Sequence, residues 1–204
     1  MNYQPLTIGR NCRICPPKAV PANNGRIDLV MQRGAFGSGE HETTESCLEI
    51  LEKIPVVKGA RILDLGSGTG ILAIAALKLG AGHAICVDIE PNAVETARNN
   101  CRLNDLEDRV THITGTLDNV LESGFDLVLA NIYGDILLSL APSLTTKTRP
   151  GGRLLLSGIL WEYNFDVRQA YERQGCVVVK NHLLEEFSSV EMLRNSGENA
   201  ASDK

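Results

Sequence analysis

Between two apolar runs of the sequence lie three glycines, each separated from the next by a single residue: Gly66, Gly68 and Gly70. The pattern predicts a buried strand over 61–65, a tight turn, and a helix that begins at Gly70 or Ile71. Glycine lets the backbone adopt positive φ angles and lets a ligand approach without a Cβ in the way. The start of a helix offers unpaired N–H groups and the positive end of its dipole to an anion. The turn is therefore a candidate site for a nucleotide-like ligand.

Two acids near this turn narrow the choice of ligand. Dinucleotide enzymes carry the pattern G-x-G-x-x-G, because a pyrophosphate lies against the helix start. Here Ile71 stands at the third glycine position, and Asp64 precedes the turn, where it suits an ammonium group better than a pyrophosphate. Asp88 follows about 20 residues later, where an acid can accept hydrogen bonds from ribose hydroxyls. S-adenosylmethionine has both an ammonium group and a ribose and fits this pattern. The alternative for Asp88 is a turn residue or a helix cap.

A second glycine-rich stretch, residues 33–44, precedes a predicted helix and contains His41, Thr43 and Thr44. The apolar residues that follow recur at i, i+3, i+4 and i+7, the period of a helix with one buried face. Either threonine fits the N-cap of that helix. Two interpretations stay open for the stretch: a flexible capped loop, or a lid over the ligand held by the later turn.

The elements that must position these residues alternate between apolar strands and helices. The alternation predicts an α/β fold with a doubly wound, mostly parallel, Rossmann-like sheet of seven strands. Right-handed crossovers bring the carboxyl ends of parallel strands to one edge, where ligands bind. No helix separates the last two strands, so one of them is expected to run antiparallel at the sheet edge. The strands are expected at 61–65, 83–89, 110–114, 125–132, 153–157, 176–183 and 188–193.

The sequence predicts one catalytic domain over residues 31–195. Residues 1–30 are rich in proline and asparagine and are expected to form a linker or edge segment, with two short strands near Cys12 and Ile27. The polar residues 196–204 are expected to be a disordered tail.

Composition excludes several classes of protein. The chain has 204 residues, of which 43% are hydrophobic and 22% charged, an ordinary globular balance. A net charge of −5 disfavours a nucleic-acid partner held by bulk electrostatics. No apolar run approaches the roughly 18 residues that span a bilayer, and a signal-peptide core is missing. We therefore expect a cytoplasmic protein with no membrane contact.

The six cysteines are scattered, which in a reducing compartment is typical of small core residues. Cys12 and Cys15 form a Cys-x-x-Cys pair, the spacing of half a zinc site or of a redox pair. A structural zinc site needs four ligands, and no second close pair of cysteines or histidines follows. We expect no metal site.

Four stretches of the chain resemble the PrmA-type methyltransferases, a family that methylates amino groups of a large-subunit ribosomal protein. The resemblance covers about residues 10–194, and its most specific element is the loop Ala-Phe-Gly-Ser-Gly-x-His-x-Thr-Thr, with Ser38 where threonine is usual. It implies an S-adenosylmethionine-dependent N-methyltransferase with S-adenosylhomocysteine as product. The implied partner is a protein with a lysine or N-terminal amine, of which a ribosomal protein is one candidate. The four stretches are 34–44, 64–72, 130–133 and 150–160.

Carried over position by position, the resemblance implies a cofactor site built from four segments. A loop lies over the cofactor, the glycine turn approaches its methionine part, an acid binds its ribose, and the segment after the third strand binds its adenine. In that order the residues are Phe36, Gly37 and Thr44; Gly66, Gly68 and Gly70; Asp88; and Gly115, Thr116 and Leu117.

Asn131 is the candidate catalytic residue. The resemblance places it beside the sulfonium methyl, where its amide can accept hydrogen bonds from an incoming amine; the alternative is a polar strand end. Tyr133 and Trp161 either line the amine channel or pack against neighbours. A lysine amine must lose a proton before attack, and we expect water to take it, aided by desolvation. His41 is the one candidate base, although holding the loop suits it better.

Several alternatives stay open. Bacterial members of the family carry a substrate-recruiting domain before this module, and the chain begins where the linker should be, so the fold and cofactor are implied more firmly than the ribosomal substrate. Similar stand-alone modules include lysine methyltransferases for other proteins. A small-molecule or nucleic-acid acceptor is the runner-up, although the Asn-Pro-Pro-Tyr-like box of base methyltransferases appears only at 131–134, without prolines. A non-catalytic module that binds S-adenosylmethionine, or a nicotinamide oxidoreductase, would also carry such a turn.

Overall fold

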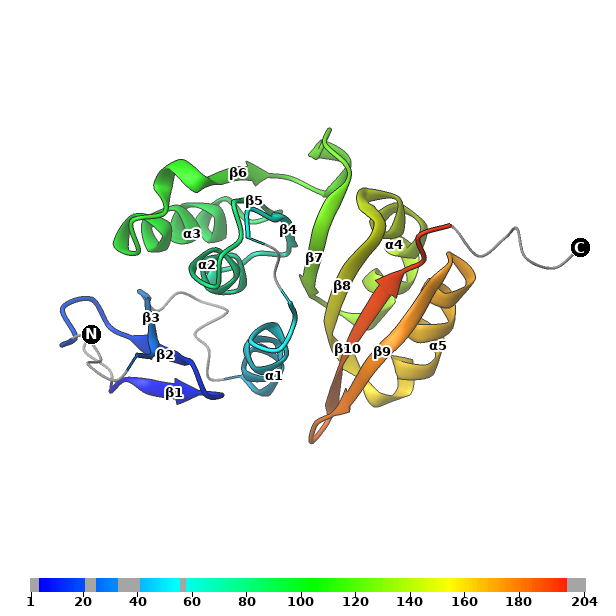
Figure 1. Cartoon of the computed structure of the whole chain (residues 1–204), viewed down its shortest axis with the longest axis horizontal. Helices are drawn as coiled ribbons and strands as arrows, with labels where there is room; N and C mark the ends of the chain where they lie inside the picture. The colour runs from blue at the N-terminus through cyan, green and yellow to red at the C-terminus, as the bar shows by residue number, and fades with distance from the viewer. Residues whose placement is uncertain (1–3, 21–24, 33–40, 56–57, 198–204) are drawn as a thin grey trace, which may run out of the picture.

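The computed structural model describes residues 4–20, 25–32, 41–55 and 58–197, and within them it contains two sheets (Figure 1). The elements are β1 (Leu6–Ile8), β2 (Cys12–Cys15), β3 (Ile27–Val30), α1 (Glu42–Leu51), β4 (Arg61–Leu65), α2 (Ile71–Lys78), β5 (His83–Asp88), α3 (Pro91–Leu103), β6 (Val110–Thr114), β7 (Phe125–Asn131), α4 (Gly134–Lys147), β8 (Thr148–Leu160), α5 (Trp161–Arg173), β9 (Cys176–Leu183) and β10 (Phe187–Arg194). Two short 3-10 turns, η1 (Glu107–Arg109) and η2 (Leu117–Asn119), flank β6.

The large sheet has seven strands in the order β6-β5-β4-β7-β8-β10-β9. All neighbouring pairs from β6 to β8 are parallel, whereas β10 is antiparallel to both β8 and β9. This confirms the predicted α/β fold with a mostly parallel seven-stranded sheet. The chain leaves β4 toward β5 on one side and later returns to β7 on the other, which creates a topological switch point at the end of β4.

The position of the antiparallel strand corrects the sequence-based expectation. We expected it at the sheet edge, but β10 lies between β8 and β9, and β9 forms the edge. Burial follows this order, because Val190 and Met192 of β10 are fully buried, while Val177 and Val179 of β9 are exposed. The apolar content of the two strands does not predict it, since β9 carries as many apolar residues as β10 or more.

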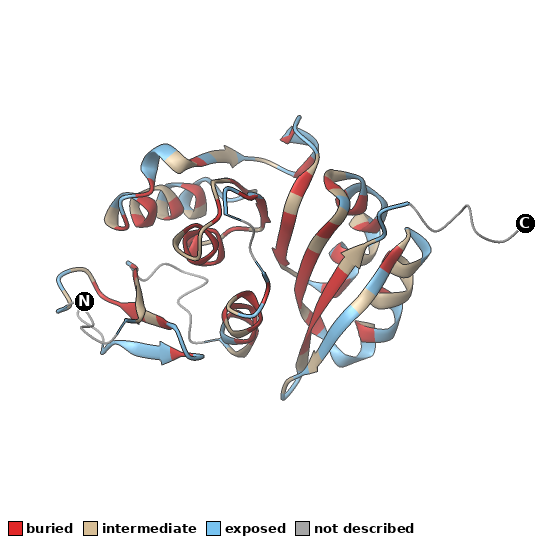
Figure 2. Cartoon of the chain, in the orientation of Figure 1, coloured by how far each residue is buried: buried red, intermediate tan, exposed pale blue. Residues whose placement is uncertain are grey.

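The helices cover both faces of the sheet. Helices α1, α2 and α3 pack on one face and α4 and α5 on the other (Figure 1). Neighbouring residues of β4 show the alternation, since Ile62 belongs to the first core and Leu63 to the second. Residues 71–77 of α2 are buried all round, as their continuous apolar sequence predicts (Figure 2). Helix α2 is thus enclosed by the sheet and its neighbours.

The N-terminal strands are part of the first core. The structure contains the two predicted strands near Cys12 and Ile27 and adds β1, in the order β1-β2-β3. Ile8, Ile14 and Leu29 are buried in the core shared with α1 and α2. Each strand carries only a few apolar residues, so the sequence pattern resembles a linker, although at least one apolar residue of each strand is buried in the core. The domain boundary at residue 30 stays a prediction.

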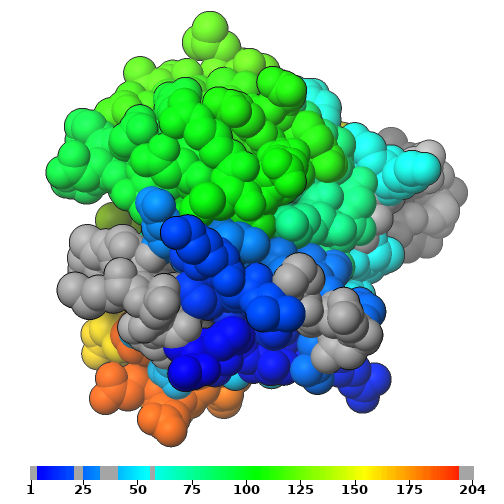
Figure 3. Space-filling view, turned by 90° about the vertical axis from the view of Figure 1, so that its left-hand side faces the viewer, coloured from blue at the N-terminus to red at the C-terminus, as the bar shows by residue number. Residues whose placement is uncertain are grey.

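Asn100 of α3 and Asn104, the C-cap of the same helix, hold the end of β3 in place. Asn104 accepts from the Val30 N–H at 3.0 Å through Oδ1 and donates through Nδ2 to the Val30 carbonyl at 2.7 Å. One turn earlier, Asn100 Oδ1 accepts from the Gln32 N–H at 2.8 Å. The two amides satisfy backbone groups of β3 as a neighbouring strand would. In the space-filling view the blue N-terminal strands lie directly against the green segments of the chain (Figure 3).

The cysteine pair of β2 does not converge on one point. Cys12 and Cys15 are three residues apart on a strand, so their side chains point to opposite faces. Burial raises the pKa of Cys12 to about 12 and that of Cys15 to about 11, which keeps both thiols protonated at neutral pH. Within the described ranges, no group of three or more His, Cys, Asp and Glu residues is placed to hold a metal ion.

Among the described residues, no helix is both long and apolar enough to cross a membrane.

Glu52, the C-cap of α1, ties the β1–β2 turn to the main fold. Its carboxylate accepts the backbone N–H groups of Arg10, Asn11 and Cys12 at 3.0, 2.8 and 2.8 Å. Partial burial raises the Glu52 pKa, but these donors favour the ionised form and outweigh burial, so the pKa lies below its ordinary value.

Replacing Glu52 with glutamine should lower the free energy of unfolding at pH 7 by about 1–2 kcal/mol, because the amide presents one acceptor oxygen instead of two. A carboxyl group whose pKa is lowered in the folded state stabilises above its unfolded pKa and loses this effect as pH falls. The free energies of unfolding of wild type and variant, measured by urea titration, should therefore approach each other as pH falls from 7 to 3. Glu122→Gln, at an exposed side chain, is the matched control, and a gap that persists at pH 3 would contradict this role.

Candidate active site

The glycine turn lies at the switch point, between the carboxyl ends of β5 and β7. Gly66, Gly68 and Gly70 have φ angles of +69°, +52° and +78°, in the region that favours glycine. The N–H groups of Gly66 and Ser67 donate to the Val87 carbonyl at 2.8 and 3.0 Å, which fixes the turn to β5. Gly70 is the N-cap of α2. The predicted sequence of strand, glycine turn and helix is confirmed.

Neighbouring segments pack closely around two of these glycines. A Cβ on Gly66 would collide with Cγ2 of Ile132, which follows β7. A Cβ on Gly70 would stand 3.1 Å from the Cβ of Ala97 on α3. The turn is thus held between β7 and α3, and glycine is required at both positions for packing as well as for conformation.

Ser67 marks the turn as a site for a polar ligand. Its side chain is buried, and within the described part of the chain its Oγ has no hydrogen-bond partner. Buried hydroxyl groups in folded proteins nearly always have a partner. An unpartnered hydroxyl beside the N-terminus of α2 is therefore a feature that a bound ligand would satisfy. Ser67 was not among the predicted site residues, although its place between two glycines of the motif was a usable signal.

Asp64 lies beneath the helix start and not at the mouth of the turn. Only 1% of the residue is exposed, and Oδ2 accepts the N–H of Ala73 in the first turn of α2 at 3.2 Å. Burial raises the pKa of Asp64 to about 7, and the nearby charge of Asp88 acts in the same direction. The geometry supports Asp64 first as a partner of α2, and its contact with an ammonium group stays a prediction.

Asp88 ends β5 and connects two turns. Its Oδ2 accepts the Gly68 N–H at 2.8 Å, and its Oδ1 accepts the Glu90 N–H at 3.0 Å. The carboxylate thus has the turn-capping role that we held as the alternative. Each carboxylate oxygen has two lone pairs, so Asp88 keeps acceptor capacity for ribose hydroxyls.

Thr116 and Leu117 follow β6 next to Asp88. The N–H of Gly115 donates to the Asp88 carbonyl at 2.8 Å. Thr116 is the N-cap of η2, and Asn119 completes a capping box with it. The side chain of Leu117 is buried. The structure therefore brings the predicted adenine segment beside the predicted ribose residue.

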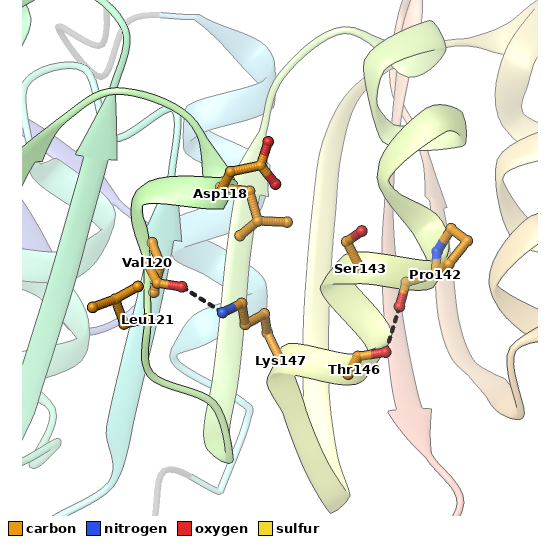
Figure 4. Close-up of a pocket in the computed structure, with 8 residues that line it drawn as sticks. Asp118, Val120, Leu121, Pro142, Ser143, Thr146 and Lys147 are labelled. Carbon is orange, nitrogen blue, oxygen red and sulfur yellow. Dashed lines mark hydrogen bonds between the residues drawn. The ribbon is translucent and has the colours of Figure 1, made fainter.

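A hollow of about 470 Å³ lies between η2 and the second half of α4 (Figure 4). Leu117 belongs to its lining, but the other lining residues come from the segment 118–121 and from the C-terminal half of α4. Lys147 Nζ donates to the carbonyls of Val120 and of Glu122, the latter at 3.0 Å, so its charge ties the loop to α4. The hollow is separate from the residues that end β4, β5 and β7.

Asn131 ends β7 and meets the first turn of α1. Its Nδ2 donates to Thr43 Oγ1 at 3.2 Å, although the two residues are 88 positions apart. On its other side lies Gly158 of β8, which has a φ angle of +76°. If Gly158 carried a side chain, its Cβ would stand 3.1 Å from Asn131 Oδ1. Thr44, the next residue of α1, is buried beside Thr43. The site thus joins α1, β7 and β8.

The predicted N-cap of α1 was wrong. We expected Thr43 or Thr44, but His41 is the N-cap, and its Nδ1 accepts the Thr43 N–H at 3.4 Å. The helix begins at Glu42, so the imidazole takes the capping role and leaves the Thr43 hydroxyl available to Asn131. Phe36 and Gly37 lie outside the described residues, and their roles stay predictions.

Sequence reasoning missed the contacts between α1 and the β9–β10 hairpin. The Glu42 carboxylate accepts the N–H groups of Glu185 and Glu186 at 2.9 and 3.3 Å. The rings of His41 and Phe187 pack edge to face with centroids 5.3 Å apart. No local pattern pointed to these pairs, because their partners are more than 140 residues apart in sequence.

Trp161 and Tyr133 are both exposed at this edge, at 54% and 68%. The indole Nε1 of Trp161 donates to the Phe187 carbonyl at 2.9 Å, which anchors one end of the ring and leaves its surface open. Exposure shows that neither side chain is buried in packing, which leaves them available to line a channel.

Replacing Asp64 with asparagine should remove a pH dependence of stability. A carboxyl group whose pKa is raised to about 7 stabilises the folded state at low pH and loses this contribution as pH rises from about 4 to 7. Relative to wild type, the free energy of unfolding of Asp64→Asn should therefore rise by up to about 3 kcal/mol between pH 4.5 and pH 8 in urea titrations. Asp166→Asn, at an exposed position of α5, is the control. Parallel curves for wild type and Asp64→Asn would contradict the buried acid.

Comparison with known proteins gives a consistent assignment. The family model described as "Ribosomal protein L11 methyltransferase (PrmA)" matches residues 1–195. The ribosomal protein L11 methyltransferase of Pelobacter propionicus is 46% identical over 179 residues, 85% of this chain and 58% of the relative. That of Trichlorobacter lovleyi is 43% identical over 178 residues, 84% of this chain and 58% of the relative. The chain thus spans less than two thirds of the length of these relatives.

Solved structures agree with the fold. The crystal structure of a ribosomal protein L11 methylase from Lactobacillus delbrueckii subsp. bulgaricus superimposes with a TM-score of 0.85 at 28% identity, covering 95% of this chain and all of that chain. An RNA methyltransferase from Salinibacter ruber, in complex with S-adenosyl-L-homocysteine, has a TM-score of 0.60 at 19% identity over 78% of this chain and 97% of its own; this likeness shows the fold alone. By the family match over residues 1–195, the chain belongs to the PrmA family of ribosomal protein L11 methyltransferases.

Proposed function

We propose that this chain is the catalytic module of an S-adenosylmethionine-dependent N-methyltransferase whose acceptors are amino groups of ribosomal protein L11. The observation that carries the proposal is the place of Asn131. An uncharged amide ends the strand next to the glycine turn, at the switch point where α/β sheets bind ligands. Family membership and the names of the relatives support the choice of L11.

The residues at the switch point fit the cofactor. Within the described residues, Ser67 Oγ is a buried hydroxyl without a partner, and the backbone of the turn is half-buried at Gly66 and Gly68, where no side chain stands. Asp88 has free lone pairs for ribose hydroxyls, and Thr116 and Leu117 lie beside it for the adenine. When bound, S-adenosylmethionine supplies a methyl group on a sulfonium sulfur and leaves as S-adenosylhomocysteine.

The chain's own contribution is mainly to position the acceptor. The Asn131 Oδ1 can accept a hydrogen bond from the amine, which directs the nitrogen lone pair away from Asn131. Such orientation of reactants can account for about 7–11 kcal/mol of a barrier. Within the described site no charged base contacts Asn131, so we propose that water removes the amine proton after desolvation has lowered the lysine pKa. The proposal carries with it the cytoplasmic location expected from the sequence.

The direct test is transfer of tritiated methyl groups from S-adenosylmethionine to purified L11 by the full chain. We expect label in methylated lysine or in the methylated N-terminal residue. In parallel, Asn131→Ala should lower kcat about 100-fold and change the cofactor Kd by less than about 3-fold. Equal losses in kcat and in cofactor affinity would contradict the role of Asn131.

Three outcomes would contradict the proposal itself, when the transfer assay is repeated with cell extract and cofactor binding is measured by calorimetry. Binding of S-adenosylmethionine without labelled product, in L11 or in cell extract, would indicate a non-catalytic module. Label in RNA or DNA, or in a small molecule only, would support the other acceptors. Binding of a nicotinamide cofactor in place of S-adenosylmethionine would indicate an oxidoreductase.

Replacing Asp88 with alanine should weaken cofactor binding by more than 10-fold, since both the ribose contact and the Gly68 hydrogen bond are lost. Isothermal titration calorimetry with S-adenosylhomocysteine measures the change. Asp118→Ala, at an exposed acid in η2, is the matched control. Unchanged affinity in Asp88→Ala would place the ribose elsewhere.

A further inference from the structure

We propose that Thr43, held in turn by His41, is a positioning residue that fixes the carboxamide of Asn131 so that Oδ1 faces the incoming amine. The inference deepens the proposed function and rests on it. From the sequence, Thr43 was a candidate helix cap, and His41 was a candidate base or a residue that holds the loop.

The direction of each hydrogen bond follows from the helix cap. A backbone N–H can only donate, so the contact of Thr43 N with His41 Nδ1 makes this nitrogen an acceptor. The Thr43 hydroxyl, 2.8 Å from the same nitrogen, must therefore donate its proton to it. The lone pairs of Thr43 Oγ1 are left to accept from Asn131 Nδ2 at 3.2 Å.

This chain of bonds discriminates between the two orientations of the amide. Rotation of the Asn131 side chain by a half-turn would exchange its oxygen and nitrogen with little change in shape. Oδ1 would then face the Thr43 oxygen, whose only proton is committed to His41, and two acceptors would oppose each other. Nδ2 would face the amine and offer it a donor. The hydroxyl therefore holds the orientation in which Oδ1 is directed at the acceptor amine.

The other side of Asn131 is shaped by β8. A Cβ on Gly158 would lie 2.6 Å from the Ile132 carbonyl oxygen and 3.1 Å from Asn131 Oδ1. The pairing of β8 with β10 shifts register at this point, as in a β-bulge. Gly158 thus lets β8 come close to the end of β7 without a side chain that would cover Oδ1.

The start of α1 is itself held from several sides. The His41 ring packs against Phe187, and Glu42 accepts two N–H groups of the β9–β10 hairpin. Thr43 is buried, and so is Thr44. Because the Thr43 hydroxyl belongs to a helix turn that is held from several sides, its hydrogen bond can fix the orientation of the Asn131 side chain.

The test compares Thr43→Val, which keeps the shape and removes the hydroxyl, with Thr43→Ser, which keeps the hydroxyl. With L11 as acceptor, Thr43→Val should lower kcat about 10-fold or more while the cofactor Kd stays within about 3-fold. Thr43→Ser should retain kcat within about 3-fold. Thr145→Val, a buried threonine at the far end of α4, controls for the general effect of this substitution.

Two further measurements separate positioning from a structural defect. In an Asn131→Ala background, Thr43→Val should cause no additional loss of kcat, because its target is gone. In ¹H–¹⁵N spectra of the full chain, the Asn131 side-chain amide signals, identified by their absence in Asn131→Ala, should shift in Thr43→Val and keep their place in Thr43→Ser.

Normal kcat in Thr43→Val, additive losses in the double variant, or unmoved amide signals would each overturn the role of Thr43. If wild type labels no amine at all, the proposed function fails and this inference falls with it. The amide spectra still report in that case whether Thr43 holds Asn131, so the two failures are distinguishable.

Discussion

The architecture of the site depends on the close approach of two chain segments at the switch point. Strands β4 and β7 are neighbours, yet the chain leaves them toward opposite faces of the sheet, through α2 and α4. Where they diverge, Gly66 lies so close to Ile132 that any side chain would collide. This contact places the glycine turn and Asn131 side by side, which the proposed transfer between a cofactor and an amine requires.

The polar groups around this contact depend on one another. Asp88 secures Gly68, Asp64 partners the first turn of α2, and Thr43 holds Asn131. Each of these bonds joins a strand end to another segment, so the geometry of the edge is set by the whole fold and not by a single loop. A preorganised arrangement of this kind reduces the cost of orienting reactants at the moment of reaction.

The fold was largely predictable from sequence, because its signals are local. Apolar runs of strand length and the glycine spacing at 66–70 identified β4, the turn and α2, and the alternation of elements identified the sheet. The features that were predicted wrongly depend on contacts with residues far away in the sequence. The cap of α1 was assigned to a threonine because threonine is a favoured N-cap, and only the contact with Asn131 shows that the Thr43 hydroxyl bonds elsewhere. The place of β10 likewise depends on its burial against β8, which a strand pattern does not reveal.

The amides of Asn100 and Asn104 have a consequence for how the chain unfolds. Both residues are buried, Asn100 in α3 and Asn104 at its C-cap, and both form hydrogen bonds with the segment 30–32 at the end of β3. The small sheet to which β3 belongs packs its apolar side chains against α1 and α2. If the N-terminal strands detached, the Oδ1 atoms of both amides would lose their N–H donors and an apolar face of the domain would meet water, at a cost far above that of an exposed surface contact. We therefore expect the described strands β1–β3 to unfold together with α3 and not to detach on their own.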